Sequence, residues 1–125
     1  MVVNILFVLA FVVAASAHTV TVRGAFLCDR DHLPIFVELL ERDNIQDDHL
    51  NWTFTEALDM FELTGTEKEY FGIMPYLRVM HRCRRFPETL TINLGRRKGE
   101  VDIDIGDIDL EDPKTSTEVR DKFTV

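Results

Sequence analysis

Hydrophobic and polar residues alternate along several short stretches of the chain, and this is the pattern of half-buried β-strands. In residues 19–27, Val20, Val22 and Phe26 fall on one face and polar residues on the other. Gly24 in the middle of this run predicts a bulge or a close approach of another backbone. We therefore expect the first strand of the fold here.

The same alternation recurs further along the chain. In residues 101–110 it changes parity at Gly106, which predicts a bulge or a turn there. Residues 35–41 are ambiguous, because their hydrophobic positions fit both a helix and a strand. Six to eight short strands with turns every eight to twelve residues indicate an all-β sandwich. The other expected strands are residues 52–57, 60–64, 76–82, 89–94 and 101–110.

The connecting segments are polar. We expect a turn at residues 29–34, a charged loop at 42–49 and a turn at Leu58-Asp59. A polar loop at 66–74, closed by Pro75, should cover its own hydrophobic residues Tyr70, Phe71 and Ile73. The polar tail after Glu111 is expected to be frayed.

The first seventeen residues differ from the rest. Residues 2–13 are apolar except for Asn4, and this run is far shorter than the roughly 20 residues that a membrane helix needs. Ala15-Ser16-Ala17 is a small-x-small cleavage signature. We expect a signal peptide at 1–17, a mature N-terminus at His18 and secretion without an anchor. A buried N-terminal element of an intracellular protein is the alternative.

Removal of that segment leaves 108 residues, which suit one small domain. We expect the sandwich to span residues 18–112 and the tail residues 113–125. Two cysteines in an exported chain are more often a disulfide than two thiols, so Cys28 and Cys83 should pair. That bond would tie the first strand to the middle of the chain and remove denatured-state entropy worth about 4 kcal/mol.

Charge and modification motifs add limited information. The chain has 14 Lys and Arg against 22 Asp and Glu, a net charge of −8, which disfavours nucleic acid as a partner. Asn51-Trp52-Thr53 is an N-glycosylation acceptor motif, which implies that Asn51 is exposed. Such motifs are short and occur by chance, so an unused motif is the alternative.

Four blocks resemble the transthyretin-like family of secreted nematode proteins. They are residues 20–28 (VTVRGAFLC), 37–43 (VELLERD), 61–67 (FELTGTE) and 75–83 (PYLRVMHRC). The resemblance implies a transthyretin-type (prealbumin-type) sandwich of about seven strands, with Cys28 and Cys83 on family cysteine positions and residues 35–41 as a strand. The chain departs from the family in lacking a glycine in the turn before Phe61 and a second cysteine pair near Cys83.

Two basic clusters suggest an anion-binding surface, for acidic phospholipid or sulfated glycan. They lie at opposite ends of one expected strand, about 35 Å apart at about 3.3 Å per residue, so they cannot form one patch through that strand. Solvated loops are the alternative interpretation. The clusters are Arg82, Arg84 and Arg85 around Cys83, and Arg96, Arg97 and Lys98.

The acidic run at residues 102–112 suggests calcium, but counting from Asp102 puts Gly106 at position five, where the EF-hand loop needs glycine at six. An acidic face on an edge strand, which protects the edge from aggregation, explains the run better. His18 at a mature N-terminus could chelate copper, yet no second histidine follows at a recognisable spacing. The candidates for that second histidine are His32, His49 and His81.

Enzymatic motifs are missing from the sequence. It has no Gly-x-Ser-x-Gly elbow, and pairing of the cysteines removes a Cys–His nucleophile. The resemblance brings to mind the 5-hydroxyisourate hydrolases related to transthyretin, but their C-terminal Tyr-Arg-Gly motif is not found in residues 115–125. We therefore expect neither an enzyme nor a cofactor.

The interpretation favoured by the sequence is a secreted extracellular binding or adaptor protein. It would recognise a protein or cell-surface component through its loops, with residues 82–85 as the first candidate. A carrier of a small apolar ligand in a transthyretin-like oligomer is the alternative, and the charged strand faces argue mildly against it. No nucleic acid and no transmembrane segment are expected.

Overall fold

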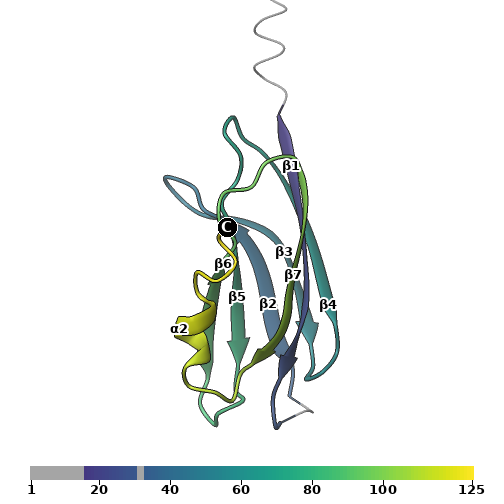
Figure 1. The fold of residues 1–125 in the computed structure, drawn as a ribbon, viewed down its shortest axis with the longest axis vertical. Helices are drawn as coiled ribbons and strands as arrows, with labels where there is room; N and C mark the ends of the chain where they lie inside the picture. Colours follow the sequence, from purple (N-terminus) through teal and green to yellow (C-terminus); the bar gives the residue numbers. More distant parts are fainter. Residues whose placement is uncertain (1–15, 31–32) are drawn as a thin grey trace, which may run out of the picture.

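The computed structural model describes residues 16–30 and 33–125, and these form a β-sandwich followed by one short helix (Figure 1). Residues 1–15, most of the expected signal peptide, lie outside the described part. The expectation of an all-β sandwich of about seven strands is confirmed. The elements are β1 (Ala17–Leu27), β2 (Ile35–Glu41), β3 (Asp48–Thr55), β4 (Phe61–Lys68), β5 (Pro75–His81), β6 (Glu88–Asn93), β7 (Glu100–Asp109) and α2 (Thr115–Val119).

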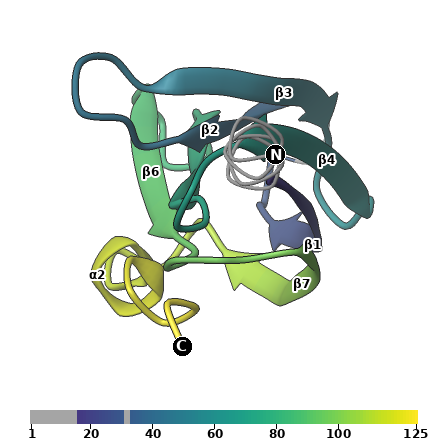
Figure 2. The same cartoon turned by 90° about the horizontal axis from the view of Figure 1, so that it is seen from above.

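The strands form two sheets, one with the order β4-β1-β7 and the other with the order β3-β2-β5-β6. β1 pairs antiparallel with β4 and parallel with β7, whereas all pairs in the four-stranded sheet are antiparallel. β2, the ambiguous segment of the sequence, is therefore a central strand. Seen from above, α2 lies at the corner between β6 and β7 (Figure 2).

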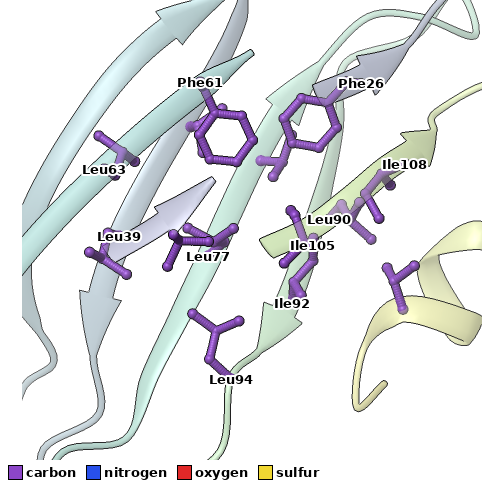
Figure 3. Packing of buried hydrophobic residues seen from close by; sticks show 14 of the residues in the cluster. Phe26, Leu39, Phe61, Leu63, Leu77, Leu90, Ile92, Leu94, Ile105 and Ile108 are labelled. Atoms are coloured by element: carbon purple, nitrogen blue, oxygen red, sulfur yellow. The ribbon is translucent and has the colours of Figure 1, made fainter. Parts of the chain in front are cut away.

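The core lies between the two sheets and contains the residues that the alternation assigned to the buried faces. Val20, Val22 and Phe26 of β1 are fully buried, as are Leu39 of β2 and Leu77 of β5. Figure 3 shows Phe26, Leu39 and Leu77 among the side chains that meet between the sheets. Each fully buried side chain of this size contributes roughly 1.5–3 kcal/mol, so this core is the main source of stability.

Gly24 and Gly106 have the structural roles that the sequence predicted for them. β1 and β7 change register after Arg23, where Ile105 and Gly106 of β7 lie opposite Gly24 alone of β1, and this is a β-bulge. Gly106 in the bulge has a φ of 68°. A Cβ on Gly24 would lie 3.0 Å from the carbonyl oxygen of Gly106 and 2.5 Å from Cγ1 of Ile105, so the close backbone approach predicted there is confirmed. Beyond the bulge Ile108 takes up the buried face.

Two strands are longer than their hydrophobic pattern indicates. β3 begins at Asp48, so the expected loop at 42–49 and the expected strand at 52–57 were wrong at their boundaries. β4 runs to Lys68 instead of ending at Thr64. Its polar end is a strand because it pairs with the start of β1, where Thr19 and Thr66 also share a hydroxyl hydrogen bond of 2.9 Å.

The loop between β4 and β5 buries fewer residues than expected. Ile73 is buried, whereas the side chains of Tyr70 and Phe71 are 68% and 77% exposed, so the prediction for these two was wrong. The reason is local. Ile73 forms an isolated β-bridge with Arg97, and this bridge holds Ile73, but not its neighbours, in a buried position beneath the loop.

The tail is ordered against the sandwich, so the expectation of a frayed end was wrong. Val119 of α2 belongs to the hydrophobic core. The N–H of Asn93 in β6 donates to the carbonyl of Arg120 at 2.8 Å, and the guanidinium of Arg97 donates to the carbonyl of Phe123 at 2.9 Å. The tail thereby covers the outer edge of β6, which would otherwise be an open sheet edge.

Candidate functional site

The turn between β5 and β6, residues 82–87, is anchored by a disulfide. Cys83 in this turn is bonded to Cys28 just after β1, with 5.6 Å between their Cα atoms. The predicted pairing is therefore confirmed. The N–H of Cys83 also donates to Nδ1 of His81 at 3.1 Å, and burial lowers the pKa of that imidazole. The turn is thus fixed at its base.

The three arginines predicted as a binding site have different surroundings. Arg84 makes two hydrogen bonds with Glu88, at 3.1 and 3.3 Å, so its charge is paired within the turn. Arg82 and Arg85 have exposed side chains. Phe86, next to Arg85, is 71% exposed. We name residues 82–87 the basic turn; two of its arginines and one aromatic ring face solvent.

An exposed aromatic cluster lies beside the basic turn, on the outer face of the four-stranded sheet. Phe36 of β2 is paired across the sheet with Phe54 of β3 and with Met80 of β5. Its ring centroid lies 5.0 Å from that of Phe54 and 5.7 Å from that of Trp52. Trp52, Phe54 and Met80 are 53%, 60% and 44% exposed. We call these four residues the aromatic face.

The basic turn and the aromatic face form a continuous surface. One shallow cleft is lined by Pro34, Met80 and Arg82, and a second by Pro34, Phe54 and Met60. Pro34 therefore joins the two regions. The aromatic face was not predicted from the sequence. The available signal was that Phe36 alternates with the buried residues Ile35 and Val37 of β2 and so lies on the opposite face.

A row of charged residues borders the aromatic face. Glu38 accepts two hydrogen bonds from the guanidinium of Arg78, at 2.9 and 3.2 Å, and its carboxylate lies 2.8 Å from Nε2 of His49. The bond from Arg78 is the main cause that lowers the pKa of this carboxyl group. Because every member has a partner, the row holds the neighbouring strands in fixed positions.

Asn51 is exposed in β3, as the glycosylation motif implied. Its Nδ2 donates to the carbonyl of Thr64 in β4 at 3.0 Å. Asn51 is adjacent in sequence to Trp52 of the aromatic face. Glycosylation of Asn51 stays a prediction.

The other sequence candidates have structural roles. Nδ1 of His18 accepts the N–H of Gly99 at 2.8 Å, and Nε2 of the same ring lies 3.0 Å from the carbonyl of Glu69. Both ring nitrogens of His18 are thus engaged, which argues against copper binding by this residue. His32, another candidate copper ligand, lies outside the described residues. Arg96 donates to the carbonyl of Phe71 and Arg97 to the carbonyl of Leu94, so two members of the second basic cluster have partners within the fold.

The acidic run lies mainly on β7, an edge strand of the three-stranded sheet. Asp102, Asp104, Asp107 and Asp109 are all exposed. Arg23 of β1 pairs with Asp102 at 3.6 Å. This agrees with the interpretation of the run as a charged edge.

Fold and sequence together define the class of protein. Residues 23–104 match the model of the transthyretin-like family, and the chain belongs to this family. The resemblance noted from the four sequence blocks is therefore confirmed. No helix in the described part of the chain is long and apolar enough to cross a membrane.

Two curated relatives come from Caenorhabditis elegans. The chain is 37% identical to transthyretin-like protein 16 over 71 residues, which cover 55% of this chain and 54% of that protein. It is 31% identical to transthyretin-like protein 1 over 74 residues, which cover 52% and 47%. The chain thus matches about half the length of these relatives.

Among solved structures, the chain is similar to part of the 9R-lipoxygenase from Cyanothece PCC8801. The TM-score is 0.41 and the identity 19%, over 74% of this chain and 17% of that one. This likeness is too distant for an inference about function.

Proposed function

We propose that the chain is a secreted binding or adaptor protein that recognises an extracellular protein or cell-surface component through the aromatic face and the basic turn. The observation that carries this proposal is the gathering of Trp52, Phe54 and Met80 as exposed side chains around Phe36 on one face of an acidic protein. Contiguous exposed apolar surface rimmed by polar groups marks interaction sites in soluble proteins.

The chemistry of this surface favours certain groups on a partner. Aromatic rings and arginines supply most of the binding energy in protein interfaces. Arg82 and Arg85 at the border favour acidic groups, and the aromatic face favours an apolar or ring-shaped surface. Three strands, the disulfide and the Glu38–Arg78 pair hold these side chains in place before binding, which lowers the entropy lost on association.

Secretion is part of the proposal and rests on separate observations. Residues 2–13 are apolar and precede Ala15-Ser16-Ala17, a cleavage signature. The Cys28–Cys83 disulfide fits an oxidising compartment, where such bonds persist. Native mass spectrometry of protein from eukaryotic cells tests this: cleavage before His18 is expected, and an intact leader on the exported protein would contradict it.

The binding test compares paired variants. Replacing Trp52 and Phe54 with serine should reduce binding of the labelled protein to cell surfaces at least tenfold, because it removes the centre of the surface. The matched control replaces Tyr70 and Phe71, which are also exposed but lie in the β4–β5 loop near the opposite end of the sandwich (Figure 1). Equal binding by both double variants would refute the assignment to the aromatic face.

A second pair of variants tests the charges. R82A/R85A should weaken binding and flatten its salt dependence, since exposed charges act through a screened field. K114A/R120A removes the same number of charges from exposed positions at the tail and should behave as wild type. The carrier alternative makes a different prediction. Native mass spectrometry should then show an oligomer that retains a small apolar molecule, and R82A/R85A should retain that molecule as well as the wild type does.

A further inference from the structure

Four carboxylates from separate segments meet at the end of the sandwich opposite the basic turn (Figure 1). Glu41 ends β2, Asp43 follows in the β2–β3 loop, Asp48 begins β3, and Glu69 follows β4. Each offers one oxygen, and these four oxygens all lie within 4.8 Å of one another. We call this group the carboxylate cluster.

A buried, unpartnered oxygen gives the cluster its significance. The side chain of Glu41 is almost completely buried, with the residue only 3% exposed. The backbone of Met74 hydrogen-bonds its carboxyl group. Oε2 of Glu41 is buried and has no hydrogen-bond partner among the described residues. Buried polar atoms in native proteins nearly always have a partner, so an unmet acceptor here points to a missing positive group.

The protein's own bases do not supply that group. Arg42, next to Glu41, donates to Oδ1 of Asn93 at 2.7 Å and stacks on the ring of Tyr76, 4.3 Å from its centroid. Arg96 donates to the carbonyl of Phe71. Within residues 16–30 and 33–125, no ion pair joins the carboxylate cluster to a lysine, arginine or histidine.

The geometry also brings like charges together. Four carboxylates lie with one oxygen each within 4.8 Å of one another, and one of them, Glu41, is almost completely buried. A bound cation would relieve the repulsion between these charges.

We propose that Glu41, Asp43, Asp48 and Glu69 bind a calcium ion. An all-oxygen set rich in carboxylates suits a hard cation and excludes the nitrogen and sulfur sites of zinc and copper. Calcium accepts six to eight oxygens at about 2.3–2.6 Å in irregular geometry, whereas magnesium requires a near-ideal octahedron. The cluster borders a cleft of about 270 Å³ lined by Glu41, Asp43 and Glu69, with space for waters that complete the coordination.

The ion would connect three segments of the fold. It would link the β2–β3 loop, the first residue of β3 and the β4–β5 loop, which are otherwise joined at this end by few side-chain bonds. The site is distant from the aromatic face and does not depend on the proposed binding function. Sites of this type in extracellular modules have dissociation constants of about 10⁻⁴–10⁻³ M.

The test uses the full folded protein with its disulfide intact, stripped with EDTA and titrated with CaCl₂ by calorimetry at constant ionic strength. One saturable site in the sub-millimolar to millimolar range is expected. At ten times the dissociation constant, Tm should rise by about 5–10 °C. Magnesium at the same concentration should produce a smaller shift. The absence of saturable calcium binding would overturn the proposal.

Variants distinguish binding of calcium at the carboxylate cluster from a general screening of surface charge by the added salt. E41Q keeps the acceptor for Met74, so it should fold, and it should lose the calcium-dependent rise in Tm; D48N serves as a second variant. The control D102N/D104N removes two exposed carboxylates from β7 and should keep full calcium binding. An unchanged calcium response in both E41Q and D48N, or an equal loss in the control, would also overturn the proposal.

Discussion

The unusual ionisation of Glu41 makes a quantitative prediction about stability and pH. Its pKa is about 7 in the fold, against an ordinary value of 4.5. The folded state therefore holds this proton more tightly than the unfolded state. The resulting stabilisation is fully present below pH 4.5 and is lost as pH rises through 7. The difference between the two values corresponds to about 3 kcal/mol at most, of which about 2.5 kcal/mol falls between pH 5 and pH 8.

Replacing Glu41 with glutamine should remove that dependence. The amide has similar size, can accept the Met74 hydrogen bond and can donate to a neighbouring carboxylate. Without calcium, E41Q should therefore be more stable than wild type by about 3 kcal/mol at pH 8 and by less than about 1 kcal/mol at pH 5.

The assay is urea unfolding followed by circular dichroism in EDTA at several values of pH. Other groups contribute to the pH dependence of both proteins, notably Glu38, whose lowered pKa acts in the opposite direction. The difference between the two proteins isolates Glu41. Parallel stability curves for wild type and E41Q would refute the reasoning, because Glu41 would then ionise as an exposed carboxyl group does.

Two further predictions concern the fold. C28S/C83S removes a disulfide that spans 55 residues, and it should lower the free energy of unfolding by about 4 kcal/mol in urea titrations. A loss below about 1 kcal/mol would show that the unfolded chain gains little conformational freedom when the disulfide is removed. G24V places a side chain 2.5 Å from Ile105 and should lower the free energy of unfolding by about 1–3 kcal/mol in the same assay. G99A has open space around its new Cβ, so only the strain of a positive φ should lower its stability. A loss below about 1 kcal/mol for G24V would contradict the close contact of β1 and β7.

Elements with one buried face could be predicted from the sequence. β1 and β7 were recognised because their apolar residues alternate, and the change of parity at Gly106 located the bulge. The polar end of β4 could not be recognised, because strands that pair near the surface leave no hydrophobic signal. The tail was misjudged for a related reason: its contacts involve backbone carbonyls such as that of Arg120, and a carbonyl is the same in every residue type.

The surfaces were harder to predict than the strands. Sequence analysis grouped Arg82, Arg84 and Arg85, but the pairing of Arg84 with Glu88 depends on the shape of the turn. The calcium hypothesis followed the acidic run because its residues are consecutive. The carboxylate cluster instead brings Glu41 and Glu69 together from segments 28 residues apart, through the packing of two sheets.

The position of β1 has a consequence for how the chain is made. This first strand lies in the centre of its sheet, between β4 and β7, and β7 ends only at Asp109. The ribosome adds about 5–20 residues per second, so several seconds pass between the synthesis of β1 and the synthesis of its second partner strand, β7. The edge of β6 is covered later still, when Arg120 has emerged. The sandwich therefore closes only after residue 120 has been made, and chaperones that shield open strands would act in that interval.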